Sequence, residues 1–187
     1  RGVEAAELTY EVANLEYSEL TVTCDGTVVT SASKGEDGVI NYVVSVNKTT
    51  SARDGSITIS NGTLTKEVKV SQLTPVFTVS RNDIELGATA DSQTTVTVTS
   101  DFDWELSMEG TGYDVTPTSY TWAEGGKETV TIQATANRTE EGVADLGTIT
   151  FVNSTTGQEL TINVTQATSY VSQGAVTVTM SIFANEG

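Results

Sequence analysis

The chain has 187 residues, with 25 Asp or Glu against 9 Lys or Arg, so its net charge at pH 7 is −16. Such an acidic chain repels nucleic acid and anionic membranes, and we expect neither as a partner. It has no histidine and a single cysteine, Cys24, which removes the commonest general base and any intrachain disulfide. No stretch approaches the ~20 apolar residues of a membrane-spanning helix.

Apolar residues alternate with Thr, Ser or Asn along most of the chain, which is the period of a half-buried β-strand. Turn signals such as Asn61-Gly62 and Gly125-Gly126 separate the alternating stretches. Short strands with regular turns predict an all-β, antiparallel sandwich architecture with little helix. In chain order, the clearest alternating stretches are 40–46, 55–60, 66–72, 95–100, 128–136, 147–152 and 159–166.

An internal repeat with a period near 90 residues organises these strands. Residues 45–72 match residues 135–166, and each segment runs from an Asn-basic-Thr triplet through Ile-Thr-apolar to a closing Gln. The matched positions are Asn47 with Asn137, Ile57-Thr58-Ile59 with Ile149-Thr150-Phe151, and Gln72 with Gln166. We therefore predict two tandem antiparallel sandwiches, one for each copy of the repeat.

The two copies differ in completeness. We assign residues 1–74 to a partial first sandwich, 75–167 to a complete second one and 168–187 to a C-terminal strand or tail, with the boundary at Pro75. Tyr10-Glu11-Val12 aligns with Trp104-Glu105-Leu106, so the first copy lacks its opening strands. An unpaired sheet edge promotes association, so we expect something to cover it.

The tail contains one more alternating stretch, Ala175 to Phe183. Its Val176-Thr-Val-Thr resembles the strand that begins at Val96. Two interpretations stay open: the tail starts a truncated third copy, or it completes the first sandwich in the same chain or in a neighbour.

The order of these motifs resembles the BACON domain, a Bacteroidetes-associated module named for carbohydrate binding. Its pattern is carried by Trp104-Glu105-Leu106, Val115-Thr116-Pro117, Asn137-Arg138-Thr139, residues 147–151 and Val164-Thr165-Gln166 in the second copy, and by residues 53–59 and 70–72 in the first. The second copy departs from the family in having Tyr113 at a usual Trp position, and the first copy has no Trp.

The resemblance implies an immunoglobulin-like fold in a protein that is secreted or held on the outer surface of a Gram-negative bacterium. It also implies host or dietary glycans, or other surface proteins, as partners. The chain begins at Arg1 rather than at a methionine and shows no apolar leader, which indicates a removed targeting segment or a fragment. Any lipid anchor would lie outside this chain.

Three aromatic residues are the candidates for stacking on a sugar: Tyr113, Tyr120 and Trp122. Tyr120 and Trp122 are two positions apart, so on a strand both rings would point to one face. A shorter repeat lies within the second copy, where residues 79–98 parallel residues 115–132. In this repeat Tyr120 and Trp122 take the positions of Ile84 and Leu86, which favours burial of both rings. Trp104 is predicted to be a core residue, and Tyr113 to be partly exposed beside Gly112 or turned inward.

Paired acidic residues lie in predicted turns, where carboxylates are ordinarily solvated. Asp101 and Asp103 are the candidate ligands for calcium, although no calcium-binding loop motif surrounds them. Without histidine or a nucleophile motif we expect no enzyme activity and no cofactor. The sequence predicts a non-catalytic surface module that binds carbohydrate or spaces and presents other domains. The alternative is an adhesion or fimbria-like subunit that associates by β-strand addition.

Overall fold

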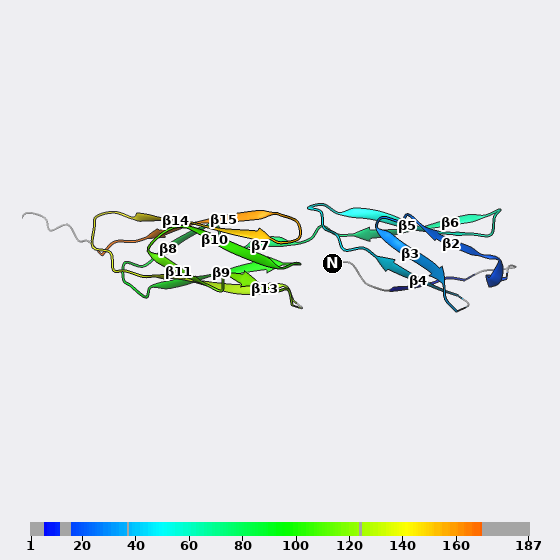
Figure 1. The fold of residues 1–187 in the computed structure, drawn as a ribbon, viewed down its shortest axis with the longest axis horizontal. Helices are drawn as coiled ribbons and strands as arrows, with labels where there is room; N and C mark the ends of the chain where they lie inside the picture. Colours follow the sequence, from blue (N-terminus) through cyan, green and yellow to red (C-terminus); the bar gives the residue numbers. More distant parts are fainter. Residues whose placement is uncertain (1–5, 12–15, 37, 124, 170–187) are drawn as a thin grey trace, which may run out of the picture.

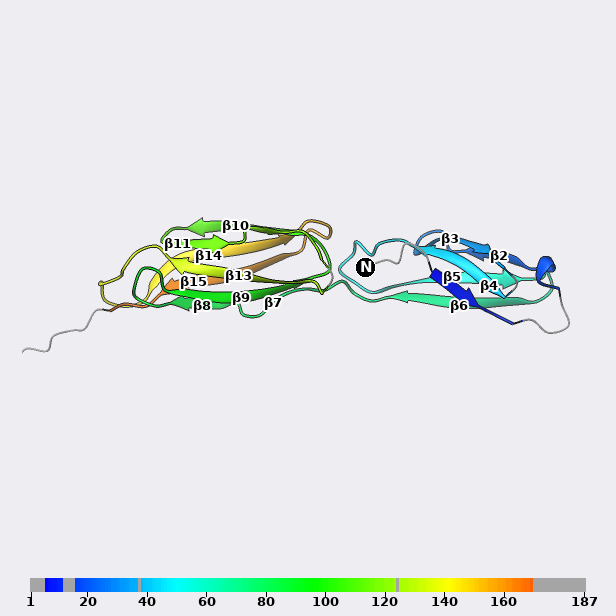
Figure 2. The ribbon, with the colours of Figure 1, turned by 90° about the horizontal axis from the view of Figure 1, so that it is seen from below.

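The computed structural model describes residues 6–11, 16–36, 38–123 and 125–169. Fifteen strands and one short helical turn make up the regular structure of this part of the chain (Figure 1). No helix there is long and apolar enough to cross a membrane. The predicted all-β, antiparallel fold is confirmed, and two β-sandwiches lie end to end (Figures 1 and 2).

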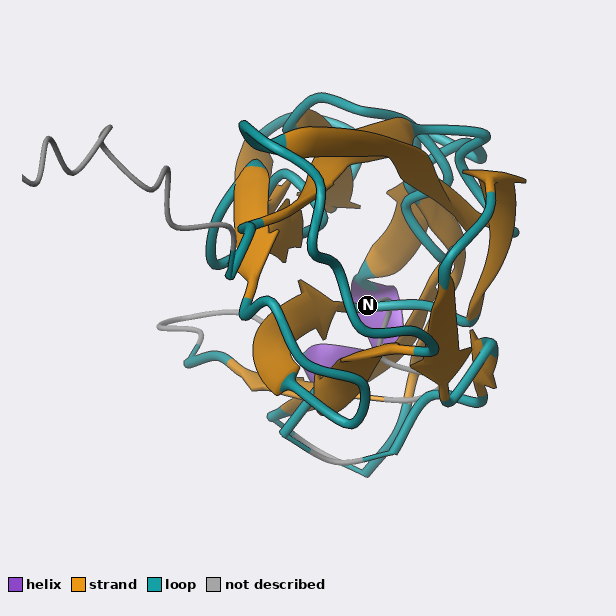
Figure 3. Ribbon diagram, turned by 90° about the vertical axis from the view of Figure 1, so that its left-hand side faces the viewer, coloured by secondary structure: helices purple, strands orange, loops and turns teal. Residues whose placement is uncertain are grey.

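The first sandwich consists of two three-stranded sheets, with strand orders β1-β4-β3 and β2-β5-β6. A single turn of 3-10 helix at Tyr17–Glu19 precedes β2, and strands make up the rest of the regular structure drawn in Figure 3. The strands are β1 (Ala6–Thr9), β2 (Thr21–Cys24), β3 (Val29–Lys34), β4 (Val39–Val44), β5 (Arg53–Ser60) and β6 (Thr65–Gln72).

The second sandwich is larger, with strand orders β12-β10-β14-β15-β8 and β11-β13-β9-β7. Its pairs are antiparallel except for β15 with β8, which run in parallel. The strands are β7 (Phe77–Val79), β8 (Asp83–Leu86), β9 (Gln93–Ser100), β10 (Trp104–Gly110), β11 (Tyr113–Thr116), β12 (Ser119–Tyr120), β13 (Lys127–Ala134), β14 (Ala144–Asn153) and β15 (Glu159–Gln166).

Strand register establishes which residues of the two copies correspond. Val22 pairs with Ile59 in the first sandwich as Leu106 pairs with Phe151 in the second, so β2 takes the place of β10. Leu20, rather than Tyr10, therefore stands where Trp104 stands, and the sequence alignment of Tyr10 with Trp104 is wrong.

The strand β1 occupies the place of β9. Leu8 pairs with Ile40 on β4 as Val96 pairs with Val130 on β13. The first sandwich thus has one of its opening strands, and within its described residues it lacks counterparts of β7 and β8. The prediction that this copy is incomplete holds, but fewer strands are missing than the sequence alignment implied.

Each sandwich buries its own hydrophobic core. Trp104 is 1% exposed, as predicted, and contacts Phe151 edge-on with ring centroids 5.3 Å apart. Leu20, Ile40 and Ile57 are among the buried residues of the smaller first core. Alternation along each strand sends Val and Ile inward and Thr outward, which explains why the period-two pattern located the strands.

Two glycines allow β10 and β14 to approach each other at their far end. Gly110 and Gly147 are paired in register and have φ values of 109° and 121°, a region that favours glycine. A Cβ atom at either position would lie 1.9 Å from a backbone carbonyl oxygen of the opposite strand. Gly147, the glycine of the repeat motif in the second copy, is therefore required for the close approach of β10 and β14.

We expect Trp104→Ala to lower the free energy of unfolding of the second sandwich by about 3–5 kcal/mol, because it leaves a large cavity in that core. The matched control is Met108→Ala on the same strand, where the side chain is 48% exposed and the loss should stay below about 0.5 kcal/mol. Urea unfolding followed by circular dichroism measures both, and equal losses would contradict the assignment of Trp104 to the core.

Candidate functional site

Tyr113 lies in the core of the second sandwich. Its side chain is 6% exposed, and its hydroxyl lies 2.8 Å from the Thr148 carbonyl oxygen, to which it donates, and 3.1 Å from that of Glu109. Burial, together with the Glu109 carboxylate, raises the pKa of the Tyr113 hydroxyl. A ring in this position has no free face, so the structure gives Tyr113 a packing role in place of a sugar contact.

Tyr120 is half-buried at the end of β12 and packs against the same core. Its ring stacks on that of Trp104, the residue opposite it on β10, with centroids 5.9 Å apart and an interplanar angle of 21°. The Tyr120 hydroxyl accepts a hydrogen bond of 3.0 Å from the Ala123 N–H. One face of this ring is therefore already used within the protein.

Trp122 lies beyond β12, because that strand ends at Tyr120. The prediction that Tyr120 and Trp122 share one face of a strand is wrong for this reason. The favoured burial holds in part: Tyr120 packs against the core, but neither ring is fully buried as Ile84 and Leu86 are on β8. The Trp122 side chain is half-buried, and its backbone N–H donates to Asp103 Oδ1 at 2.8 Å.

The carboxylates of Asp101 and Asp103 accept hydrogen bonds from two different loops. Asp101 Oδ2 accepts a hydrogen bond of 2.7 Å from the Val76 N–H, whereas Asp103 Oδ1 accepts one from the Trp122 N–H. Within the described ranges, no group of three or more Asp, Glu or Cys side chains is placed to hold a metal ion. Calcium binding by these two residues stays a prediction, and the structure assigns both carboxylates to backbone donors.

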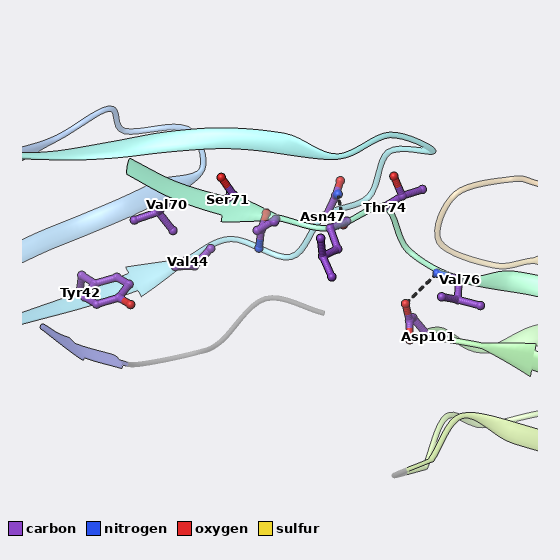
Figure 4. Close-up of a pocket in the computed structure, with 10 residues that line it drawn as sticks. Tyr42, Val44, Asn47, Val70, Ser71, Thr74, Val76 and Asp101 are labelled. Atoms are coloured by element: carbon purple, nitrogen blue, oxygen red, sulfur yellow. Dashed lines mark hydrogen bonds between the residues drawn. The ribbon is translucent and has the colours of Figure 1, made fainter. Parts of the chain in front are cut away.

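A cavity lies between the first sandwich and the linker, and its lining includes Val76 and Asp101 as well as residues of the first sandwich (Figure 4). Its volume is about 510 Å³, and its lining includes Tyr42 and Val44 of β4 and Val70 and Gln72 of β6. We refer to these four residues and the free edge of β6 as the β6 groove. Nearby, Leu73 is 85% exposed, so the groove continues into an apolar surface at the linker.

The second sandwich shows why the β6 groove is open. There β15 takes the place of β6, and β8 pairs with its outer edge, placing Ile84 and Leu86 in the core. Ile162 and Val164 of β15 are 0% exposed as a result. Their counterparts Val68 and Val70 remain half-exposed, since no described strand pairs with the outer edge of β6.

Sequence reasoning did not locate this groove. The signal was present in the repeat: residues 66–72 alternate as residues 160–166 do, yet the first copy offers no match to Ile84 and Leu86. Because Tyr10 was aligned with Trp104, the sequence did not reveal that the first copy lacks a counterpart of β8, nor that the outer edge of β6 is therefore free.

A hydrogen-bonded turn connects β2 and β3 in the first sandwich. Burial raises the pKa of Asp25, but hydrogen bonds from the Thr27 hydroxyl and from the N–H groups of Val28, Val29 and Ser56 outweigh this effect. The net result is a pKa well below the usual range for an aspartate. Asp25 is thus a structural acceptor that joins the β2–β3 turn to β5.

A scan against protein-family models finds no match, and a search of curated proteins finds none. Solved structures with a similar fold include domains 1–6 of the surface layer protein SbsC, with 17% identity and a TM-score of 0.45. They also include a Bacteroides ovatus GH5 xyloglucanase (24% identity, TM-score 0.39) and the D00-D0 domain of intimin (11% identity, TM-score 0.38).

These matches cover 81%, 50% and 87% of this chain, respectively. The chain spans 20% of the surface layer structure, 19% of the xyloglucanase and 92% of the intimin fragment.

We expect Asp25→Asn to destabilise the first sandwich at pH 7 and to do so progressively less as the pH falls. A depressed folded-state pKa contributes stability that is present above the unfolded value of about 3.9 and is lost as the pH falls below it. Thermal unfolding of wild type and variant from pH 7 to pH 2 measures this convergence. Asp114→Asn, an exposed position on β11, is the control, and a pH-independent difference would contradict the role of the charge.

Proposed function

We propose that this chain is a non-catalytic module of a bacterial cell-surface protein and that it spaces and presents the parts attached to its ends. The observation that carries the proposal is the linker, residues 73–76, which is hydrogen-bonded to both sandwiches. A fixed junction between two sandwiches turns them into a single extended spacer instead of two loosely tethered domains.

The first sandwich holds the linker through Asn47. This side chain is buried, and its Nδ2 donates to the Leu73 carbonyl at 3.1 Å and to that of Ser51 at 2.8 Å. Its Oδ1 accepts from the Thr49 N–H and hydroxyl, so the amide is used at both ends. Asn47 therefore anchors the start of the linker to the loop after β4.

The second sandwich holds the other end of the linker through Asp101. The Val76 N–H donates to Asp101 Oδ2 at 2.7 Å, and the Asp101 N–H donates to the Val76 carbonyl at 3.0 Å (Figure 4). Between the two anchors, Pro75 is buried and its ring fixes φ. Three of the four linker residues are thus restrained.

The acidic surface and the sequence resemblance support an extracellular place for this spacer. The chain carries a net charge of −16, which keeps an extended surface protein soluble and apart from anionic lipid. The resemblance to the BACON domain supports a Bacteroidetes outer surface. The lack of histidine supports a role without catalysis.

Carbohydrate binding is the second candidate, supported by that resemblance and by Trp122. The half-buried Trp122 lies next to the Gly125-Gly126 turn, where a sugar could reach part of its indole ring. Tyr113 gives this candidate no support, and Tyr120 has one face against Trp104.

For the spacer, we expect a narrow distance distribution between spin labels on the two sandwiches, at Glu67→Cys and Asp114→Cys in a Cys24→Ser background. Asp101→Ala should broaden the distribution, because Val76 loses its acceptor, while Asp101→Asn keeps an acceptor oxygen and should retain most of the order. Pulsed electron paramagnetic resonance measures it. A broad distribution in the parent protein would overturn the proposal.

For carbohydrate, we expect no retardation in affinity electrophoresis against mucins, glycosaminoglycans and plant polysaccharides, with or without calcium. Retardation by one polysaccharide that Trp122→Ala abolishes would establish the second candidate. Calcium-dependent retardation that is lost in Asp103→Asn would restore the metal prediction. Circular dichroism of each variant controls for folding.

A further inference from the structure

The β6 groove has the shape left by a missing strand. In the second sandwich the equivalent space is filled by β8, whose Ile84 pairs with Val164 and whose Leu86 pairs with Gln166. By strand register, Val70 and Gln72 are the first-sandwich counterparts of Val164 and Gln166. An incoming strand that runs parallel to β6 would therefore place two apolar side chains into the cavity of about 510 Å³.

We propose that residues 170–187 of a second copy of this chain occupy the β6 groove, pairing in parallel with β6 and joining copies head to tail. This inference goes beyond the spacer proposal, because it concerns strand pairing at the free edge of β6. Residues 170–187 lie outside the described part of the chain.

Spacing along the chain selects the residues that enter the groove. Asp83, the first residue of β8, lies 11 positions after Gln72, and Thr177 lies 11 positions after Gln166. On this alignment Val178 takes the place of Ile84 and Met180 takes the place of Leu86. The tail thus repeats the polar-apolar alternation of β8, with apolar residues at the two inward positions.

Chain direction favours a second copy over the same molecule. β6 ends next to the linker, and the last described residues lie at the end of the second sandwich opposite the linker (Figures 1 and 2). A tail that continues forward enters the first sandwich of an in-line neighbour in the direction of β6. The contact joins different surfaces of the two molecules, so it propagates into an open chain of copies.

A tail that turns back on its own molecule meets β6 in the wrong direction. To pair in parallel it would have to pass both sandwiches and reverse. By analogy with β8, such a tail would pass the eight residues of β15, the four-residue linker and the last four residues of β6, and then reverse to pair over four residues. This path is about 66 Å at ~3.3 Å per residue, whereas 18 fully extended residues reach about 59–65 Å, so none are left for the reversing turn. This shortage favours a second copy over parallel completion within one molecule.

Charge sets the conditions under which the copies associate. Each copy carries a net charge of −16, so neighbours repel each other at low ionic strength. The walls of the groove on the first sandwich carry the uncharged side chains of Tyr42, Val44, Val70 and Gln72, and Asp101 is the single acidic residue in the lining of the cavity. Raising the salt concentration should therefore screen the repulsion, leave the apolar contact intact and promote association.

The test is sedimentation velocity of the full chain over a range of concentrations at 0.15 M and 0.5 M salt. We expect oligomers that grow with concentration and with salt. Val178→Asp should weaken the association about tenfold or more, because it places a charge at an apolar position of the groove. Thr177→Asp is the matched control, since it adds the same charge on the outward face, where β8 itself has Asp83.

Two variants distinguish the β6 groove from any other surface. Val70→Asp blocks the groove and leaves the tail intact, while Val178→Asp blocks the tail and leaves the groove intact. Each should be monomeric alone, and a mixture should form dimers that stop at two copies. If Val70→Asp unfolds the first sandwich by circular dichroism, mixing Val178→Asp with wild type should shorten the oligomers instead, by capping their growing ends.

Two results would overturn the proposal. A wild-type chain that stays monomeric at every concentration and salt would mean that no second copy fills the groove. Oligomers of Val178→Asp as large as those of wild type would mean that the copies associate through a different surface.

Discussion

The structure depends on how the last strand of each sandwich is covered. In an antiparallel sandwich, the closing strand has one edge paired and one free, and its inward side chains stay half-exposed until something lies beside them. The second sandwich meets this requirement with one parallel pair, β8 on β15, which leaves Ile162 and Val164 fully buried. Burial of one such side chain is worth about 1.5–3 kcal/mol.

The first sandwich has the same closing strand without the cover. Its core gathers around Leu20, Ile40 and Ile57, while Val68 and Val70 are only partly removed from water. We therefore expect the two copies to differ in stability and to unfold as separate units rather than as one two-state protein. The cavity beside Val70 and the free edge of β6 are two aspects of the same missing strand.

The sequence was informative where apolar and polar residues alternate along a strand, because the pleat turns successive side chains to opposite faces. Alternation located the strands, and the repeat related Ile57 to Ile149 and Gln72 to Gln166, as strand register now confirms. It placed Trp104 in the core because a buried Trp is common in such sandwiches. These inferences needed only local periodicity and an approximate knowledge of how strands pack.

The sequence was less informative where the answer depends on where a strand ends. Tyr120 and Trp122 read as one alternating pair, but β12 stops at Tyr120 and the chain turns so that the Trp122 N–H meets Asp103. Tyr10 resembled Trp104 by its distance from the repeat, yet β1 takes the place of β9 and Leu20 takes the Trp104 position. Loop length and strand termination are set by tertiary contacts, which periodicity does not encode.

The direction in which the chain leaves β6 and β15 relates the linker to the free edge of β6. β6 and β15 each run toward the exit of their sandwich, so the segment that follows either strand is already heading in the direction of a parallel partner. Residues 73–86 use this within the chain: they leave β6, pass the linker and become the β8 that covers β15. The tail leaves β15 with the same spacing and the same alternation. A copy placed in line then repeats, without a covalent bond, the junction that the chain already makes between its two sandwiches.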